Sequence, residues 1–206
     1  MDIQAKGLGR RFNKNWIFSG FEQLFPFPCN YAILGPNGSG KSTLLQVLSG
    51  YLSPSSGTLD YQIQGKKIEP DLVYQKISFL SPILEIPMVL TVEEFFQFHF
   101  GLKGIYHSDK VESWIDSSGL REHRKKSIGT LSSGLLQRVK LISAFGSKTP
   151  ILLLDEPTMN LDEAGIEWFT ALFHENKNER TLILGSNLNR EFELCDHQIH
   201  IMDYKK

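Results

Sequence analysis

The chain has 206 residues, a formal net charge of −1 and two cysteines. This length suits one domain with a sizeable core, and the near-neutral charge argues against a nucleic-acid partner, which needs a basic surface. Cys29 and Cys195 have neither metal-binding nor redox spacing, so we expect a reduced cytosolic protein. The first residues lack an apolar signal segment, and no run of about 20 apolar residues predicts a membrane span.

The first part of the chain predicts short strands over residues 3–8, 16–25 and 29–34, and the third strand leads into a glycine-rich segment. Residues 43–48 follow as an apolar-rich helix. The segment between strand and helix matches the P-loop pattern G-x-x-x-x-G-K-[ST]. It reads Gly35-Pro36-Asn37-Gly38-Ser39-Gly40-Lys41-Ser42.

The residue types in this segment suit phosphate binding. Its glycines let the backbone turn N–H groups inward as an anion nest, and the helix N-terminus adds partial positive charge. Lys41 is expected to reach the β- and γ-phosphates, the Ser42 hydroxyl to ligate Mg²⁺, and Thr43 to belong to the same binding set. A chance glycine-rich turn is the alternative, but the flanking strand and helix argue against it. The sequence therefore predicts binding of a nucleoside triphosphate.

The middle of the chain predicts strands over 57–63 and 77–80, followed by helices. Thr91 and Glu94 form a capping box that opens an aromatic-rich helix through residues 95–100. A second amphipathic helix covers 109–118 and stops at Gly119. We interpret the Phe and Trp side chains of these helices as core.

The second half alternates helices with strands. The predicted order is helix 134–145, strand 151–154, helix 162–176, strand 181–184, a short helix near 190–194 and strand 198–202. Such alternation predicts a parallel sheet covered by helices on both faces, an α/β fold.

The strand over 151–154 is aliphatic and delivers two carboxylates, Asp155 and Glu156, at its C-terminal end. Ligands of α/β sheets bind at this end of the strands. Asp155 is expected to hold Mg²⁺ through water, and Glu156 to orient or deprotonate the attacking water. The alternative is a strand followed by an acidic helix cap, and the presence of a P-loop favours the functional interpretation.

Two further segments identify a family by resemblance. Residues 131–138, Leu-Ser-Ser-Gly-Leu-Leu-Gln-Arg, resemble the signature motif L-S-G-G-Q-x-Q-R of ATP-binding cassette (ABC) ATPases. Residues 159–162, Met-Asn-Leu-Asp, resemble the family's D-loop S-A-L-D. Phe12 lies where the family places an aromatic ring that stacks on adenine. The resemblance covers essentially the whole chain, in the family's order and spacing.

The resemblance implies a P-loop NTPase fold with a mostly parallel sheet and an antiparallel β subdomain, in a single domain over 1–206. A small helical subdomain is expected over approximately 82–148. Two cassettes, in a homodimer or a heterodimer, are expected to dimerise head to tail, with each ATP between the P-loop of one and the signature helix of the other. Ser132, Ser133 and the N–H of Gly134 then contact the opposite subunit's γ-phosphate.

For a transporter subunit, the resemblance also implies separate transmembrane partner subunits, with this chain peripheral on the inner face of the cell membrane. The signature is similar to those of export-type cassettes. Residues 83–90 lie where the family docks its membrane subunit, and the alternative is that they belong to the core of the helical lobe.

Four positions depart from the family pattern. Ser133 and Leu135 replace a glycine and a glutamine of the signature, which is a mild change. Pro82 stands where a Mg²⁺-contacting glutamine is expected, and the Ser81 hydroxyl could replace that glutamine. Asn187 stands where a histidine usually contacts the γ-phosphate; asparagine is shorter and carries no charge. The last two changes predict intact nucleotide binding and slow hydrolysis.

Other classes remain as alternatives. A GTPase needs an N-K-x-D motif, and residues 176–179 end in Glu instead of Asp. A chromosome-maintenance ATPase would insert long coiled coils, and a translation-factor type would carry two cassettes. A weakly hydrolysing regulatory protein or heterodimer partner stays open as the second function.

Overall fold

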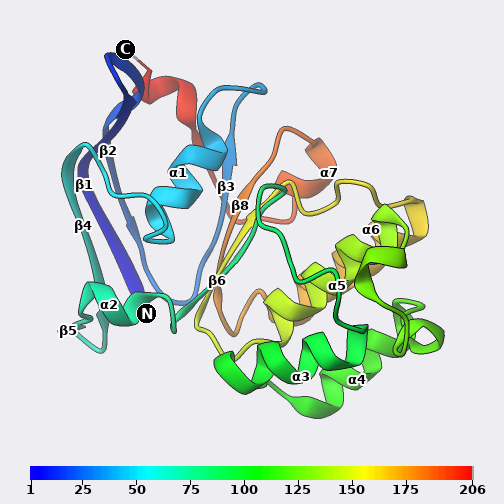
Figure 1. Cartoon of the computed structure of the whole chain (residues 1–206). Helices are drawn as coiled ribbons and strands as arrows, with labels where there is room; N and C mark the ends of the chain where they lie inside the picture. Colours follow the sequence, from blue (N-terminus) through cyan, green and yellow to red (C-terminus); the bar gives the residue numbers. More distant parts are fainter. Residues whose placement is uncertain (206) are drawn as a thin grey trace.

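The computed structural model describes residues 1–205 as two β-sheets with helices packed on them (Figure 1). One sheet has five strands, each parallel to its neighbours, and the strand order departs from the chain order. In spatial order it contains β6 (Ile77–Leu80), β7 (Ile151–Asp155), β8 (Thr181–Gly185), β3 (Asn30–Leu34) and β9 (His197–His200). The predicted α/β class with a parallel sheet is therefore confirmed.

The second sheet is antiparallel and comes from the first third of the chain. A long hairpin provides two of its strands, and Asn13 turns it with a left-handed φ of 54°. In spatial order the sheet contains β2 (Asn15–Phe25), β1 (Asp2–Phe12), β4 (Ser56–Ile63) and β5 (Lys66–Lys67).

Side-chain alternation along the buried parallel strands divides the core into two clusters. Ile151 and Leu153 of β7 pack toward α1 (Lys41–Leu48) and the antiparallel sheet. Leu152 and Leu154 point to the opposite face and pack against helices of the second cluster. Successive side chains of a strand point to opposite faces, so this one strand contributes to both clusters.

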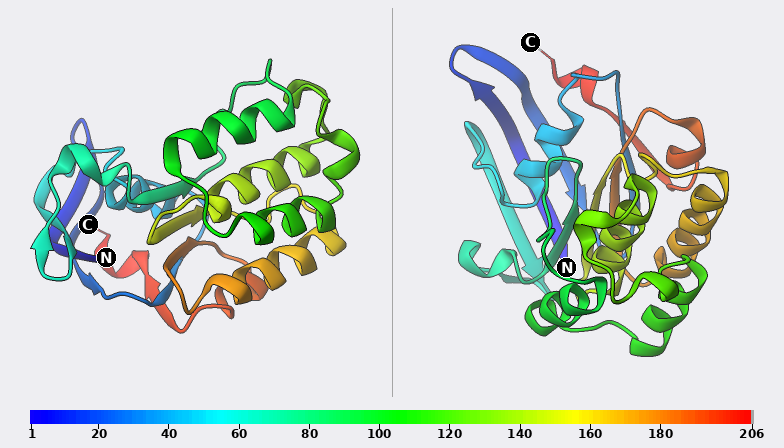
Figure 2. Two further views of the ribbon diagram at one scale, coloured as in Figure 1. Left: turned by 90° about the horizontal axis from the view of Figure 1, so that it is seen from below. Right: turned by 45° about the vertical axis from the view of Figure 1, so that its right-hand side comes forward.

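Helices cover that opposite face, as the two further views in Figure 2 show. Two short helices are not part of this cluster. α2 (Pro70–Val73) contributes Val73 to the first cluster, and α7 (Asn189–Phe192) contacts β3. The four longer helices of the second cluster are α3 (Val92–Lys103), α4 (Ser108–Ser117), α5 (Ser133–Gly146) and α6 (Glu163–Asn176).

Helix α3 begins as its sequence predicts. The Glu94 N–H donates to Thr91 Oγ1 over 3.2 Å, and the Thr91 N–H donates to Glu94 Oε2 over 2.8 Å, which completes the capping box. Its aromatic side chains divide between core and surface. Phe95 and Phe96 are buried, as expected, whereas Phe98 is exposed.

The predicted last strand, 198–202, is wrong at its C-terminal end. β9 ends at His200, and Ile201–Tyr204 form a 3₁₀ helix. His200 is in register with Leu34, the last residue of β3, after which the chain of β3 leaves the sheet. Residues 201–205 therefore have no continuation of β3 to pair with. The short elements α2 and β5 were not predicted either.

Gly57 of β4 offers a test of the antiparallel sheet. It has a φ of 78°, and a Cβ there would lie 2.4 Å from the backbone oxygens of Lys6 and Gly7. We expect Gly57→Ala to lower the free energy of unfolding by about 2 kcal/mol or more, because left-handed strain and a backbone clash add. Urea unfolding measures the change.

Gly101→Ala is the matched control. Gly101 lies inside α3, has an ordinary φ, and nothing would lie within 4 Å of the added methyl group. Alanine should raise the free energy of unfolding there by up to about 1 kcal/mol through its helix propensity. Equal effects of the two variants would contradict the described backbone.

Candidate nucleotide-binding site

The P-loop connects β3 to α1 and depends on glycine at three positions. Gly35, Gly38 and Gly40 have φ values of 154°, 74° and 109°. A Cβ on Gly40 would lie 2.6 Å from Ile17 Cγ2. Gly40 is also the N-cap of α1, so no side chain caps this helix and its first N–H groups stay available to an anion.

Lys41 lies folded against this loop. Its Nζ donates to the carbonyl oxygens of Gly35 over 2.7 Å and Pro36 over 3.2 Å, and the side chain is buried. The ammonium charge is therefore held beside the loop backbone.

A cavity of about 190 Å³ opens over the loop. Its wall includes Glu156, which directly follows β7, and Ile17 of β2. The hydroxyl of Ser39 is buried there and has no hydrogen-bond partner among residues 1–205. The predicted nucleotide-binding residues that line the cavity are Asn37, Gly38, Ser39, Gly40, Lys41, Ser42 and Thr43.

Asp155 ends β7 next to the first turn of α1 and is only 2% exposed. Its two oxygens accept separate hydrogen bonds. Ser42 Oγ donates to Oδ1 over 3.0 Å, and Ser81 Oγ donates to Oδ2 over 3.1 Å. Burial raises the pKa of Asp155 above its usual range, and the two serine hydroxyls oppose this shift.

Glu156 follows at a sharp change of chain direction, with a φ of 48°, and its N–H donates to the Gly185 carbonyl over 3.0 Å. Glu156 is one of the residues that line the P-loop cavity. A carboxylate able to act on water thus lies beside the candidate phosphate site.

These residues fit Mg²⁺ and a triphosphate. The hydroxyl of Ser42 and the carboxylate of Asp155 are hard oxygen donors, which Mg²⁺ prefers. The unpaired Ser39 hydroxyl, the Lys41 ammonium and the uncapped helix end suit phosphate oxygens.

A second cavity, of about 340 Å³, adjoins the first because Asn37 and Glu156 line both. Asn187 lies here, and its Nδ2 donates to Asn37 Oδ1 over 3.1 Å. Met159 and Asn160, from the loop after β7, complete part of the wall. The structure thus brings Asn187 to the edge of the P-loop.

The signature residues are not brought to this chain's own P-loop. Ser132 caps α5 by accepting a hydrogen bond from the Leu135 N–H over 3.3 Å, and Ser133 is exposed beside it. Gly134 is the second residue of the same helix, and a Cβ there would lie 3.0 Å from the Asn160 carbonyl oxygen. Helix α5 packs on the opposite face of the parallel sheet from α1.

The sequence did not identify every residue around the site. Phe12 is 45% exposed, and the Arg10 guanidinium lies over its ring, 4.7 Å from the ring centroid. The residue of this hairpin that reaches the P-loop cavity is Ile17, an apolar strand residue without any distinguishing pattern. Pro82 is exposed in a turn, so Ser81 is the residue of this segment that faces Asp155.

Comparison with known proteins gives matches over most of the chain. The profile of the ABC transporter family matches residues 29–159. The uncharacterized ABC transporter ATP-binding protein YcbN of Bacillus subtilis is 30% identical over 93% of this chain. The linearmycin resistance ATP-binding protein LnrL, also of Bacillus subtilis, is 29% identical over 98% of it. The chain spans 63% and 66% of the lengths of these two relatives.

A solved structure shows the same fold. The dimeric ATP-binding cassette MJ0796, in a post-hydrolysis state bound to ADP and Pi, is 21% identical with a TM-score of 0.82. The match covers 96% of this chain and 93% of that one. The P-loop NTPase fold expected from the sequence is thereby confirmed. Together with the family profile, these similarities show that the chain belongs to the ABC transporter family of ATP-binding proteins.

Proposed function

We propose that this chain binds Mg-ATP, hydrolyses it, and drives separate transmembrane subunits of a transporter by dimerising on ATP. The observation that carries the proposal is the hydrogen bond between Ser42 and Asp155, with Glu156 lining the adjacent cavity. It joins a phosphate-binding loop, a pair of metal-binding oxygens and a candidate base at one edge of the sheet.

The residues divide the work by chemistry. The backbone of residues 35–43 and Lys41 bind the phosphates, and Ser42 and Asp155 hold Mg²⁺. When bound, Mg²⁺ neutralises part of the phosphate charge. Glu156 is the catalytic residue, because its carboxylate can orient water or take its proton inside the same cavity. Phe12 is the proposed adenine contact.

A second cassette is the proposed partner of this one. Ser132, Ser133 and Gly134 stand at the start of α5, which packs on the opposite face of the parallel sheet from α1, and none of them lines the P-loop cavity. They can complete a nucleotide site only on another chain, either a second copy or a related cassette. Dimerisation of MJ0796 is a property of that protein, and it supports the same proposal for this chain.

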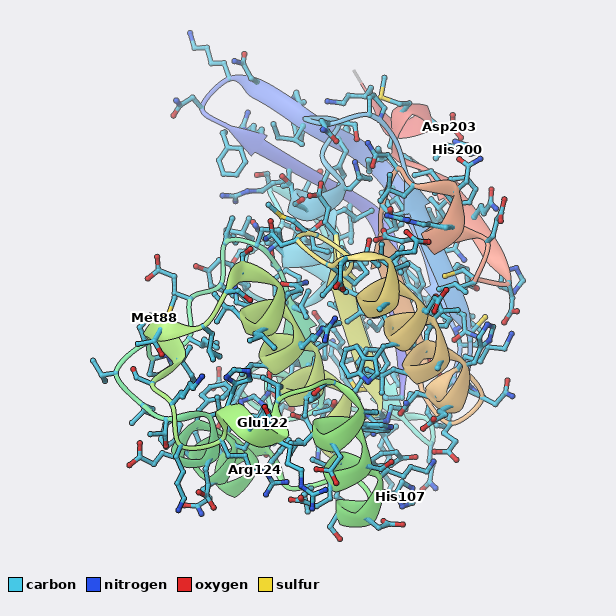
Figure 3. The ribbon with its side chains drawn as sticks, turned by 90° about the vertical axis from the view of Figure 1, so that its right-hand side faces the viewer. Met88, His107, Glu122, Arg124, His200 and Asp203 are labelled. Atoms are coloured by element: carbon cyan, nitrogen blue, oxygen red, sulfur yellow. The ribbon has the colours of Figure 1, made fainter. Side chains whose placement is uncertain are left out.

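The segment 83–90 is the proposed contact with the membrane subunits. Ile83, Met88 and Val89 are exposed apolar side chains, and Val89 is 86% exposed. Figure 3 shows Met88 at the edge of the molecule, beside the helices. Exposed apolar patches mark interfaces. Residues 1–205 contain no helix long and apolar enough to cross a bilayer.

We propose an export role and a location on the inner face of the cell membrane. LnrL is named for resistance to linearmycin, and a resistance function is compatible with outward transport. The export-like signature sequence at 131–138 supports the same direction.

Glu156→Gln tests the ATP-driven dimer. The amide keeps the size of the side chain but cannot take a proton from water, so ATP should stay bound between two chains. With Mg-ATP, we expect gel filtration with light scattering to give twice the monomer mass. The double variant with Lys41→Ala should remain monomeric, because it lacks the charge that binds the phosphates. A Glu156→Gln protein that stays monomeric while binding Mg-ATP would contradict self-dimerisation and favour a heterodimer.

Asn187→His tests whether Asn187 slows hydrolysis. An imidazole is longer than the asparagine amide, can carry charge, and would stabilise the charge that develops on the γ-phosphate. We expect steady-state phosphate release to rise about tenfold or more, given that one transition-state donor is worth about 10²–10³ in rate.

Asn187→Ala serves as the control, because it removes the hydrogen bond to Asn37 without adding a donor. Its turnover should not exceed that of the wild type. If Asn187→His still dimerises but hydrolyses ATP at the wild-type rate, then Asn187 is not what limits hydrolysis.

A further inference from the structure

Ser81 is the only residue of the segment after β6 whose hydroxyl contacts Asp155 in the described structure. β6 and β7 are parallel neighbours, with Leu80 in register with Leu154, so Ser81 and Asp155 follow at matching positions. Ser81 Oγ donates to Oδ2 over 3.1 Å, and Ser81 is 1% exposed. The contact is therefore buried and shielded from competing water.

The chain around Ser81 is fixed by its neighbours. The Leu84 N–H donates to the Ser81 carbonyl over 3.1 Å and closes a four-residue turn with Pro82 at its second position. Proline is common at this position, because its ring holds φ near the value that the turn requires. Lys140 of α5 donates to the Leu84 carbonyl over 2.8 Å. These contacts hold the backbone of the turn, from which the Ser81 hydroxyl reaches Asp155.

The two serines hold Asp155 from opposite sides. Ser42 donates to Oδ1 and Ser81 to Oδ2, so the plane of the carboxylate is fixed and each oxygen keeps a lone pair free. Ser42 can donate its hydrogen bond to Asp155 while a lone pair of its own oxygen binds a cation. Without Ser81, Oδ2 loses its hydrogen-bond donor and the carboxylate is held at one oxygen.

We propose that Ser81 is a positioning residue for Mg²⁺, which acts by orienting the carboxylate of Asp155 toward the metal. The inference rests on the proposed function, since it concerns the same site. It gives Ser81, the first residue after β6, a role at the metal site in a segment that has no glutamine. Groups that orient metal ligands typically change metal affinity by about 10–100-fold when removed.

Calorimetry with ATP in MgCl₂ and with ATP in EDTA tests the proposal. The quantity of interest is the ratio of the two affinities, because it isolates the contribution of Mg²⁺. We expect Ser81→Ala to reduce this ratio about tenfold or more, with affinity in EDTA unchanged. Ser81→Thr keeps a hydroxyl at the same position and should restore at least half of the loss on a logarithmic scale.

Ser78→Ala is the matched control. Like Ser81, Ser78 is a buried serine; it lies within β6, and its Oγ pairs with Thr149 Oγ1 over 2.8 Å instead of with Asp155. It should leave the ratio unchanged, even if both variants lower the melting temperature equally. A Ser81→Ala ratio equal to the wild-type ratio, or an equal loss in MgCl₂ and EDTA, would overturn the role of Ser81. Wild-type protein that binds no ATP in either condition would overturn the proposed function as well.

Discussion

The hydrogen bond between Ser42 and Asp155 is the contact on which the site depends. It joins the first turn of α1 to the end of β7, two elements separated by more than a hundred residues of sequence. The contact is possible because the parallel strands β3 and β7 end at the same edge of one sheet. Burial raises the pKa of Asp155, because it disfavours the charged carboxylate. A bound cation would offset this unfavourable effect.

The parallel sheet also separates the P-loop from the signature motif. Alternate side chains of β7 pack toward α1 on one face and toward α5 on the other. The P-loop and the signature therefore stand at the N-termini of helices on opposite faces. Gln137 of α5 donates to the Pro157 carbonyl over 2.7 Å, and Arg138 pairs with Asp162 at 2.8 Å. These contacts connect the signature helix to the loop that follows Asp155 and Glu156.

Local signals predicted the parts of the fold that depend on local chemistry. The P-loop glycines, the Thr91 capping box and the aliphatic run of β7 each specify their conformation within a few residues, and the structure agrees. Features that depend on distant neighbours were harder to predict. β9 ends early because its partner strand ends, and Ile17 lines the cavity because a hairpin folds over the loop. Neither event leaves a pattern in the sequence.

We propose that each nucleotide site is made by two chains, and mixing two complementary variants is the sharpest test of this arrangement. Two proteins are made, both with Glu156→Gln. One also carries Lys41→Ala, which disables its P-loop. The other carries Ser133→Glu, because a carboxylate is tolerated at a helix N-terminus but repels phosphate. Neither protein alone should retain radiolabelled ATP in a dimer. Mixed, they should form heterodimers that retain one ATP, since one pairing joins an intact P-loop to an intact signature. If the mixture retains no ATP, the nucleotide site is not shared between two chains in this way.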